Sequence, residues 1–520
     1  MINLRSTLAA VLFAVLTAAA AVAQEHPGHA GANVEHGKRA EQSQHDADEK
    51  RGSGPSPGVL SLLPPDSVTE HSIATKSGPL AYTATAGTFP LFDQSGAQSA
   101  SVFYTAYVAK GGDNGGNAAA RPVTFVFNGG PGAASAFLNL GLVGPRIAEF
   151  GPSGRDGAKT RLVDNPDTWL GFTDLVLIDP IGTGWSRAAK RDDDRGFWSV
   201  DGDAQSMAKV IALYVAKNGR AASPKFILGE SYGGFRAAKV ARVLQDDQGI
   251  VVSGILMLSP LLDGNFQFGG DRFALGAALQ LPSLAAAELE RKGTFSPQAL
   301  APAEHFALND YLTTLAGPPP QGDAAKDFYA RVAKITGVSE EAIARSRGFI
   351  RDDYVKNLAG DHKIVSHYDA TFASDDPYPE TPVDRGPDPI LDGMIRAYGG
   401  AFVGYARDEL GFKTEMTYNL LDGAISRQWD WQRDHGQPSV MDDIRDLLAL
   451  TPSFRLMIAH GYSDMVTPYA VTRYLLQHLP PFSGEARTTL KLYRGGHMFY
   501  LDPDSRKAFT ADARTMYVQP

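Results

Sequence analysis

Six short runs of β-branched and aliphatic residues, each closely followed by glycine or proline, constrain the fold of this chain more than any other feature. The runs are apolar throughout rather than alternating, which is typical of strands buried on both faces in a parallel sheet that helices cover. Helical patterns fit between them, for example over residues 203–216 and 441–450. We therefore predict an α/β fold with a mostly parallel central sheet, helices on both faces and a ligand site where the strands end. The runs cover residues 123–127, 175–178, 225–228, 254–258, 455–459 and 489–493.

Two other segments depart from this pattern. Residues 80–92 and 100–110 alternate between apolar and polar, which predicts an antiparallel hairpin at the edge of the sheet. From 266 to 437 the strand pattern stops, and we predict a mainly helical insertion that caps the strand ends and shapes a substrate pocket; the alternative is an appendage with no role in a site. The core then comprises residues 59–265 and 438–520. The predicted helices of the insertion include 284–292, 324–336 and 340–346, with Ser339 placed to cap the last.

One short motif indicates a nucleophile. Residues 229–233 read Gly-Glu-Ser-Tyr-Gly and match the pattern Gly-x-Ser-x-Gly, which alone is a weak signal. Here the motif follows a predicted buried strand and precedes a helix-compatible stretch over 234–244. That order places the serine on a sharp, exposed elbow, and the flanking glycines permit the close backbone approach that the turn needs. Ser231 is therefore the candidate nucleophile.

Asp464 and His497 are the candidate partners of this serine. A serine hydroxyl needs a base to take its proton, and the base needs a carboxylate that holds it in the right tautomer. Each partner follows one of the last two predicted strands, in the chain order Ser, Asp, His. Taken singly, each is an ordinary loop residue, but the coincidence of all three favours a triad. His460 also follows a strand, but it shares a loop with Asp464 and is the poorer candidate base.

Backbone donors for an oxyanion are expected at two places. Residues 128–132 read Asn-Gly-Gly-Pro-Gly directly after the first buried strand, and Gly130 offers an N–H that no side chain shields. The N–H of Tyr232, just past the serine, is the second donor. Such donors commonly contribute about 3 kcal/mol each to transition-state stabilisation. The rival interpretation, a phosphate-binding loop, is weaker because the Lys-Ser/Thr end is missing and Pro131 removes a donor.

Composition excludes several classes of protein. None of the 520 residues is cysteine, so disulfides, thiolate nucleophiles and thiolate metal sites are ruled out. A hydrophobic content of 43% indicates a globular chain rather than a disordered one. The net charge of −9, without any cluster of Lys and Arg, argues against a nucleic-acid partner. We predict no cofactor and no metal.

The N-terminus has the pattern of a secretory signal peptide over residues 1–23, with Arg5, an apolar run and small residues at 21–23. The alternative is a membrane anchor, but the run is short and no basic stop signal follows directly. We therefore expect an exported protein, periplasmic or secreted, without stable membrane association after cleavage. Residues 24–58 are predicted to be a disordered linker, whose histidine spacings match no compact metal site. These histidines are His26, His29, His36 and His45.

Taken together, the motifs resemble the serine carboxypeptidase family, which has the α/β-hydrolase fold. The resemblance covers about residues 120–265 and 450–500, and it is most specific at the glutamate before the serine and at the Asn-Gly-Gly-Pro-Gly loop. The residues that carry it are 128–132 with Ser135, Gly144 and Pro145, 165–169, 177–186, 229–234, Asp464 with Val466 and Pro468, and 496–498.

The resemblance implies roles for individual residues. Ser231 would be the nucleophile, His497 the base and then the acid, and Asp464 the residue that orients His497, with Gly130 and Tyr232 as oxyanion donors. Asn128 and Glu230 match the family's recognition of the substrate's terminal carboxylate. Glu230 must be protonated for that role, because two carboxylates do not bind unless one carries a hydrogen, and burial should raise its pKa. The alternative is that Glu230 only braces the elbow.

Two positions depart from the family pattern. Leu142 stands where the family usually has a second glutamate that shares a proton with the one before the serine. We therefore expect weaker carboxylate binding or a shifted pH optimum. Ala133 stands where the family often has a half-cystine, so a stabilising disulfide is missing here, which implies nothing about chemistry.

The resemblance implies a serine-type carboxypeptidase that acts on peptide substrates through an acyl-enzyme. Three alternatives use the same triad: an esterase, an acyltransferase, or an aminopeptidase of the prolyl iminopeptidase kind, which usually has Trp where this chain has Tyr232. A non-catalytic binding protein on a hydrolase scaffold is a further alternative. It is disfavoured because such a protein loses triad residues without penalty.

Overall fold

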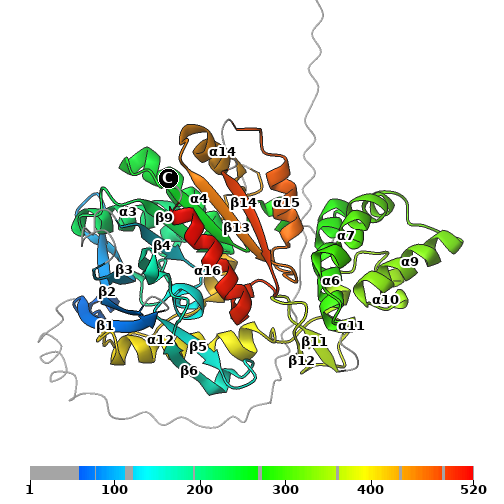
Figure 1. The fold of residues 1–520 in the computed structure, drawn as a ribbon, viewed down its shortest axis with the longest axis horizontal. Helices are drawn as coiled ribbons and strands as arrows, with labels where there is room; N and C mark the ends of the chain where they lie inside the picture. Colours follow the sequence, from blue (N-terminus) through cyan, green and yellow to red (C-terminus); the bar gives the residue numbers. More distant parts are fainter. Residues whose placement is uncertain are drawn as a thin grey trace, which may run out of the picture. The chain divides into compact units, whose positions relative to one another are not determined.

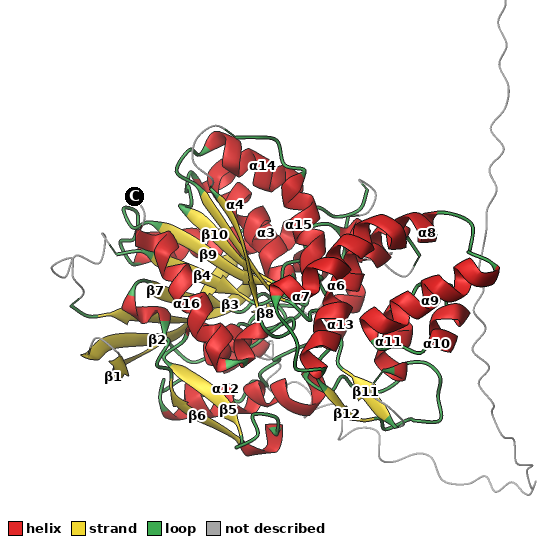
Figure 2. Ribbon diagram, turned by 45° about the vertical axis from the view of Figure 1, so that its right-hand side comes forward, coloured by secondary structure: helices red, strands yellow, loops and turns green. Residues whose placement is uncertain are grey.

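A mixed sheet of ten strands runs through the described part of the chain (Figures 1 and 2). Residues 57–520 form one compact unit. The predicted signal peptide, and all of the predicted linker except Gly58, lie outside the described residues. The computed structural model describes residues 58–75, 78–111, 121–190, 194–267, 272–358, 362–432, 436–482 and 487–518.

The sheet is parallel over six strands and antiparallel on one side. Its strands are β1 (Ser67–Thr75), β2 (Gly78–Phe92), β3 (Gln98–Ala109), β4 (Val123–Phe127), β7 (Asp174–Ile178), β8 (Arg187–Ala188), β9 (Lys225–Glu230), β10 (Gly254–Leu258), β13 (Arg455–Gly461) and β14 (Thr488–Tyr493). The parallel part has the order β7-β4-β9-β10-β13-β14. On the other side β1, β2 and β3 pair antiparallel, and β3 also pairs with β7 and β8. The predicted α/β-hydrolase fold with a mostly parallel sheet is confirmed.

The central strands are apolar on both faces because helices pack against each face of the sheet with their apolar sides. In β10, Ile255 packs into one buried cluster and its neighbour Leu256 into another on the opposite face. The helices of the first cluster are α3 (Val200–Lys217), α4 (Tyr232–Gln248) and α14 (Met441–Leu450). The second cluster includes residues of α12 (Ala397–Asp408) and α16 (Pro503–Val518).

The strands differ from the sequence prediction in several respects. The predicted hairpin forms as β2 and β3, but β1 pairs outside it, so the hairpin is not the edge of the sheet. The sequence of β1 is mostly polar, which hid it. Strands β9 and β13 each run two residues further than predicted, and a second hairpin, β5 (Arg146–Phe150) with β6 (Thr160–Asp164), was not predicted.

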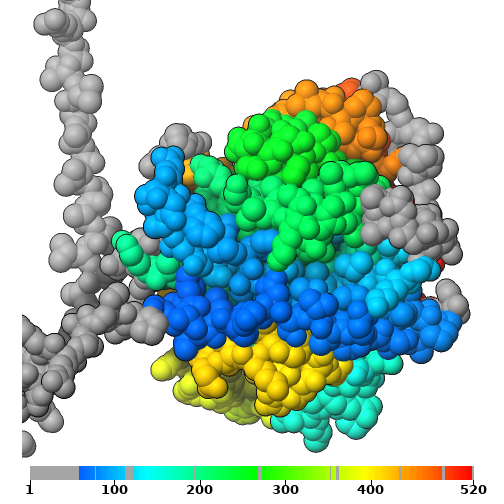
Figure 3. Space-filling model, turned by 90° about the vertical axis from the view of Figure 1, so that its left-hand side faces the viewer, coloured from blue at the N-terminus to red at the C-terminus, as the bar shows by residue number. Residues whose placement is uncertain are grey.

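The N-terminal strands lie between two other parts of the fold. Figure 3 shows them in blue across one face, with the segment of α12 in yellow below and the green segments above. The hydroxyl of Thr414 donates to the carbonyl of Leu62 at 2.7 Å. On the other side Nζ of Lys217, on α3, lies 2.9 Å from the carboxylate of Asp66. These contacts fix the first strands to segments far along the chain.

The first half of the predicted insertion is helical and has its own apolar core. Ser339 caps α10 by accepting from the N–H of Ala342 at 3.2 Å, as predicted. The buried residues of this core include Leu281, Phe306 and Val332. Its helices are α6 (Ala274–Arg291), α7 (Pro297–Phe306), α8 (Leu312–Ala316), α9 (Gly322–Thr336), α10 (Glu340–Arg345) and α11 (Arg351–Asn357).

The second half of the insertion is mixed rather than helical. A small antiparallel pair, β11 (Lys363–Val365) and β12 (Ala373–Asp375), precedes a long irregular stretch. Helix α12 and the short α13 (Gly423–Gln428) follow. This half lacks the long helical periodicity of the first, and its residues reach the strand ends. The outer boundaries of the insertion stay a prediction.

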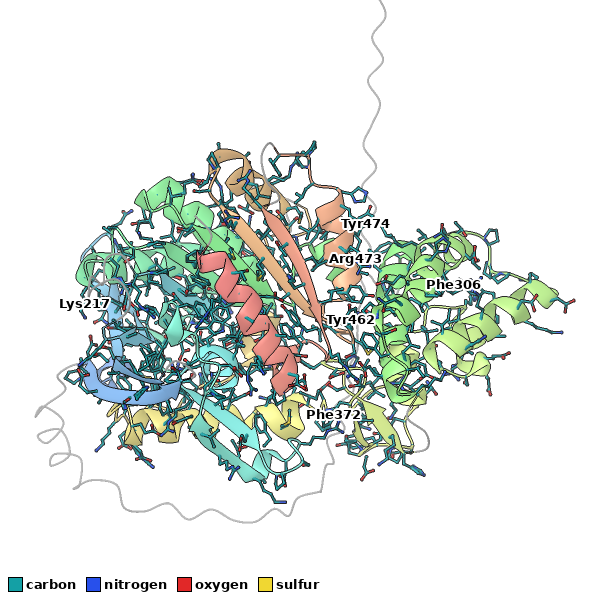
Figure 4. All side chains as sticks on the ribbon, viewed as in Figure 1. Lys217, Phe306, Phe372, Tyr462, Arg473 and Tyr474 are labelled. Carbon is teal, nitrogen blue, oxygen red and sulfur yellow. The ribbon has the colours of Figure 1, made fainter. Side chains whose placement is uncertain are left out.

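Side chains of the core face the insertion's helices. In Figure 4, Tyr462, Arg473 and Tyr474 lie on the side of the core that is next to these helices. Nη1 of Arg473, on α15 (Tyr469–Gln477), lies 2.8 Å from Oε1 of Glu304 on α7, and the rings of Phe295 and Tyr462 lie 4.9 Å apart. In the described part of the chain we find neither a helix of the length and apolar character that a bilayer crossing needs, nor a metal-holding group of acidic and histidine side chains.

Candidate active site

Ser231 sits on a sharp turn between β9 and α4. Its backbone has φ 60° and ψ −125°, and φ lies in the left-handed region that a serine rarely adopts. The turn needs glycines, because a Cβ on Gly229 would lie 2.0 Å from the carbonyl oxygen of Gly233. A Cβ on Gly233 would lie 2.6 Å from the carbonyl oxygen of Phe127. The serine side chain makes no capping bond to α4, so its hydroxyl is available at the strand end, as the sequence predicted.

Asp464 and His497 are brought together by neighbouring parallel strands. They lie on the loops after β13 and β14, and Nδ1 of His497 is 2.9 Å from Oδ2 of Asp464. Both side chains are buried. Because Nδ1–H donates to the carboxylate, Nε2 is left to accept a proton. Both side chains of this pair therefore lie where the sequence predicted a base and its orienting acid.

Thr467 is a partner of this pair that the sequence reasoning missed. Its hydroxyl donates to Oδ2 of Asp464 at 2.8 Å and lies 3.1 Å from Nδ1 of His497. The N–H groups of Val466 and Thr467 donate to the other carboxylate oxygen at 2.8 and 3.0 Å. The aspartate thus has partners on both oxygens and keeps one orientation. No signal in the sequence marked this threonine.

The two histidines after β13 and β14 differ in environment. Burial alone would lower the pKa of His497, but the carboxylate of Asp464 outweighs it and the pKa is raised. Burial lowers the pKa of His460 to about 4, and its Nε2 pairs with the hydroxyl of Thr472 on α15 at 2.8 Å. The side chain of His460 therefore bonds to α15 and is not among the residues that line the cavity with Ser231.

Ser231 and His497 line one cavity of about 170 Å³. Within the described residues, no hydrogen bond joins the side chains of Ser231 and His497. The polar part of the lining holds Asn128, Glu230 and the Gly129–Gly130 backbone. None of the lining residues is Lys or Arg. Most of the remaining lining is apolar, and much of it comes from the second half of the insertion: Tyr368, Leu391, Ile395, Leu421 and Trp431.

Two residues of the cavity lining have free backbone N–H groups. Gly130, with φ 101°, and Tyr232 both line it, and within the described residues neither N–H donates to a protein acceptor. The Asn128–Gly130 loop lies close against the elbow, because a Cβ on Gly129 would come within 2.6 Å of both Glu230 O and Tyr232 N. The two predicted oxyanion donors are therefore adjacent to the serine and unpaired, which is the arrangement such a hole requires.

The Glu230 side chain is buried beside Ser231 and bonded on both oxygens. Nδ2 of Asn128 donates to Oε2, and the hydroxyl of Tyr500 donates to Oε1 at 2.9 Å. Burial raises the pKa of Glu230 to about 7, against the lowering effect of His497 and of these two donors. Leu142, at the position where the family usually has a second acid, is buried in the apolar core. Tyr500 was missed by the sequence reasoning, since nothing but its position after His497 points to it.

Asn128 is itself held in place. Its Oδ1 accepts from the N–H of Leu138 at 3.0 Å, and its carbonyl accepts from Nη1 of Arg236 at 2.5 Å. Arg236 in turn pairs with the buried Asp203 at 2.7 Å. Ala133, where the family often has a half-cystine, bridges to Leu421 in the insertion. Backbone pairing therefore ties this loop to the insertion.

The insertion also contacts the loops that carry Asp464 and His497. The N–H of Ala370 donates to Ser463 O at 3.0 Å, and the N–H of Met465 donates to His367 O at 3.2 Å. The Ser463 hydroxyl donates to Asp369 at 2.7 Å. Residues 366–370 therefore hold the acid's loop from outside the core.

Fold and site together have the features of the α/β-hydrolase fold class: an elbow serine, an acid and a histidine after later strands, and free N–H groups beside the serine. Residues 83–289 match the family model described as serine carboxypeptidase. The matched segment contains the Asn128 loop and Ser231. Asp464 and His497 lie beyond the matched segment and are placed by the structure alone.

One of the similar solved structures shares the fold of this chain. The prohormone-processing carboxypeptidase Kex1(delta)p from Saccharomyces cerevisiae is 15% identical, covers 84% of this chain and 91% of its own, and has a TM-score of 0.51. The peroxisomal α/β-hydrolase Lpx1 from the same yeast is 12% identical, with coverages of 88% and 90% and a TM-score of 0.38. Homoserine O-acetyltransferase from Bacillus anthracis is 10% identical, with coverages of 88% and 99% and a TM-score of 0.35. No curated protein sequence matches this chain.

Proposed function

We propose that this protein is a serine-type carboxypeptidase that releases the C-terminal residue of peptides through an acyl-enzyme on Ser231. The observation that carries the proposal is the side chain of Glu230, which is buried in the lining of the cavity next to the serine and whose pKa is raised to about 7. A carboxyl group that holds a proton can donate it to a carboxylate, as a peptide's free C-terminus requires. Asn128 offers the second polar contact.

The chemistry follows from the geometry around Ser231. Nε2 of His497 takes the hydroxyl proton as the oxygen attacks the carbonyl carbon of the last peptide bond, and Asp464 stabilises the imidazolium. The N–H groups of Gly130 and Tyr232 stabilise the oxyanion. The imidazolium then gives its proton to the leaving amine as the C–N bond breaks. Water, activated by the same histidine, cleaves the acyl-enzyme and regenerates Ser231.

The cavity lining suggests what is bound beside the scissile bond. With no Lys or Arg in the lining, a substrate carboxylate would be held by neutral donors, namely protonated Glu230 and the Asn128 amide. The remaining wall is apolar, so apolar side chains next to the scissile bond fit it best. Peptides with an apolar C-terminal region are therefore the substrate class that we propose.

A matched set of substrates tests this function. We expect cleavage of N-blocked dipeptides that have a free C-terminus, and no cleavage of the same dipeptides as C-terminal amides. Faster turnover of simple esters or of free-N-terminal dipeptides would support the esterase, acyltransferase or iminopeptidase alternatives instead. Labelling of Ser231 by a fluorophosphonate, absent in Ser231→Ala, separates all of these from a non-catalytic binding protein.

Export is part of the same proposal. The pattern of residues 1–23 supports cleavage after Ala23 and a periplasmic or secreted location. N-terminal sequencing of the protein from cell fractions tests it. A mature protein that begins at Gln24 in the periplasm or medium is the expected result, and an uncleaved chain in the cytoplasm would contradict it.

A further inference from the structure

Tyr500 is a buried residue whose hydroxyl contacts one residue of the proposed site, Glu230. Its hydroxyl donates to Oε1 of Glu230 at 2.9 Å, while Asn128 occupies Oε2. Glu230 lines the cavity and Tyr500 does not. The hydrogen bond to Glu230 is therefore the contact by which the Tyr500 hydroxyl can influence a bound substrate.

The ring of Tyr500 is held so that its hydroxyl meets that carboxyl group. It lies on a short 3-10 turn, η10 (Phe499–Leu501), three residues after His497. Its ring packs against a glycine, because a Cβ on Gly141 would lie 2.8 Å from Cε2 of Tyr500. The ring of Phe499 lies 6.0 Å away at 75°. One short segment thus carries both His497 and the partner of Glu230, so their positions are linked.

Tyr500 is a donor that does not titrate in the working range. Burial raises the pKa of its hydroxyl well above the ordinary tyrosine value, so it remains a neutral O–H. Two neutral donors, one on each oxygen, fix the plane of the Glu230 carboxyl group without adding a charge. An acid in this position would instead titrate together with Glu230.

The other charged and titratable groups near Glu230 come from several elements. His497 lowers its pKa and Asp464 raises it. The hydroxyls of Tyr368 and Tyr398, both from the insertion, are also close enough to interact with the Glu230 charge. In the described residues, none of these four side chains forms a hydrogen bond with the Glu230 carboxyl group. Its hydrogen-bond partners are Tyr500 and Asn128.

We propose that Tyr500 is the positioning residue for carboxylate recognition: with Asn128 it holds the Glu230 carboxyl group in the orientation that binds a peptide's free C-terminus. This inference rests on the proposed function. It also accounts for Leu142, since a phenol from the His497 segment takes the contact for which the resemblance led us to expect a second acid.

The test is Tyr500→Phe, which keeps the ring and its packing and removes the donor. For an N-blocked dipeptide with a free C-terminus we expect KM to rise about tenfold with kcat within about twofold. This is about the loss expected when the hydrogen bond from protonated Glu230 to the charged substrate carboxylate is misaligned. For a simple ester without a carboxylate we expect both constants to stay unchanged. Equal losses on the two substrates, or slower fluorophosphonate labelling, would mean a scaffold role and would overturn the proposal. Unchanged KM for the dipeptide would also overturn it.

Two further variants sharpen the result. Tyr493→Phe removes another tyrosine donor, which bonds to Asp512 at 2.6 Å away from the cavity, and should change neither KM. In a Glu230→Gln background, Tyr500→Phe should have a smaller effect than in the native protein, because the two residues act together. Full additivity of the two changes would overturn the proposal.

A second readout separates this inference from the proposed function. Carbon-13 titration of the Glu230 carboxyl group, assigned with Glu230→Gln, should show a higher pKa in Tyr500→Phe, since the lost bond favoured the ionised form. An unchanged pKa would overturn the positioning role. If the native protein cleaves only esters, the carboxypeptidase proposal fails, while this titration still decides whether Tyr500 controls Glu230.

Discussion

The backbone N–H of His497 donates a 2.6 Å hydrogen bond to the carbonyl oxygen of Tyr368, a residue of the insertion. The two rings also meet edge to face, with centroids 5.4 Å apart at 86°. A Cβ on the preceding Gly496 would lie 2.0 Å from the same carbonyl oxygen, so the segments fit only with glycine there. The loop that carries the proposed base is therefore held by the insertion as well as by β14.

Weakening the contact between the Tyr368 segment of the insertion and the loops of the proposed site should reduce both activity and stability. Asp369, next to Tyr368, is partly buried and accepts from Ser463 and from Thr371. Asp369→Ala leaves these donors unpaired, so we expect destabilisation of about 1–3 kcal/mol in denaturant unfolding and a lower kcat/KM. Asp375→Ala, an exposed acid on the same segment, is the matched control and should change neither. A fully active Asp369→Ala protein would show that the contact is dispensable.

Because His497 and not His460 is assigned as the base, substitutions of the two buried histidines should have very different effects on kcat. His497→Ala and Asp464→Asn should each lower kcat by about 10⁴-fold, because the base or its tautomer is lost. His460→Gln should keep kcat within severalfold, because this side chain pairs with Thr472 and lies outside the cavity lining. Steady-state kinetics on one dipeptide tests all three. A comparable loss in His460→Gln would require a different base.

The pH profile should be bell-shaped. Neutral His497 is the base, so kcat/KM falls as acid protonates it below its raised pKa. Protonated Glu230 binds the carboxylate, so kcat/KM also falls as pH rises through about 7. Because each charge shifts the pKa of the other, the two limbs belong to the pair.

Glu230→Gln isolates the alkaline limb of this profile. The amide cannot ionise, so the fall above about pH 7 should disappear for a free-C-terminal dipeptide. A native profile that peaks near pH 5 with the steepness of an acid pair would contradict this assignment of the limbs.

The oxyanion loop should be intolerant of a single methyl group. Gly129→Ala places a Cβ 2.6 Å from two backbone atoms of the elbow, which must push the Gly130 donor away from Ser231. We expect kcat to fall by at least about 10²-fold, the usual cost of one lost oxyanion donor. Gly404→Ala, in α12 with no atom within 4 Å of the new Cβ, is the matched control. It should leave kcat unchanged and stabilise the protein by about 0.5–1 kcal/mol.

Much of the scaffold could be predicted from local pattern. β4 (Val123–Phe127) and β10 (Gly254–Leu258) have the bounds that their apolar runs predicted. The elbow at Ser231 was visible because strand, glycines and helix are contiguous there. The edge strand β1 was not, since its residues are mostly polar and give no apolar run, although they pair along the backbone of β2.

The parallel sheet and the serine elbow were predictable from the amino-acid pattern, because each depends on residues close together in the chain. The acid and the base were predicted from their places after the last two strands. What surrounds these residues became known only from the folded chain. Tyr500 and Glu230 are 270 positions apart, and Tyr368 reaches His497 from the insertion. Such contacts depend on how distant segments pack around a buried carboxyl group, and no periodicity in the sequence records that packing. Burial, which only the folded chain produces, is also what brings the pKa of Glu230 to about 7.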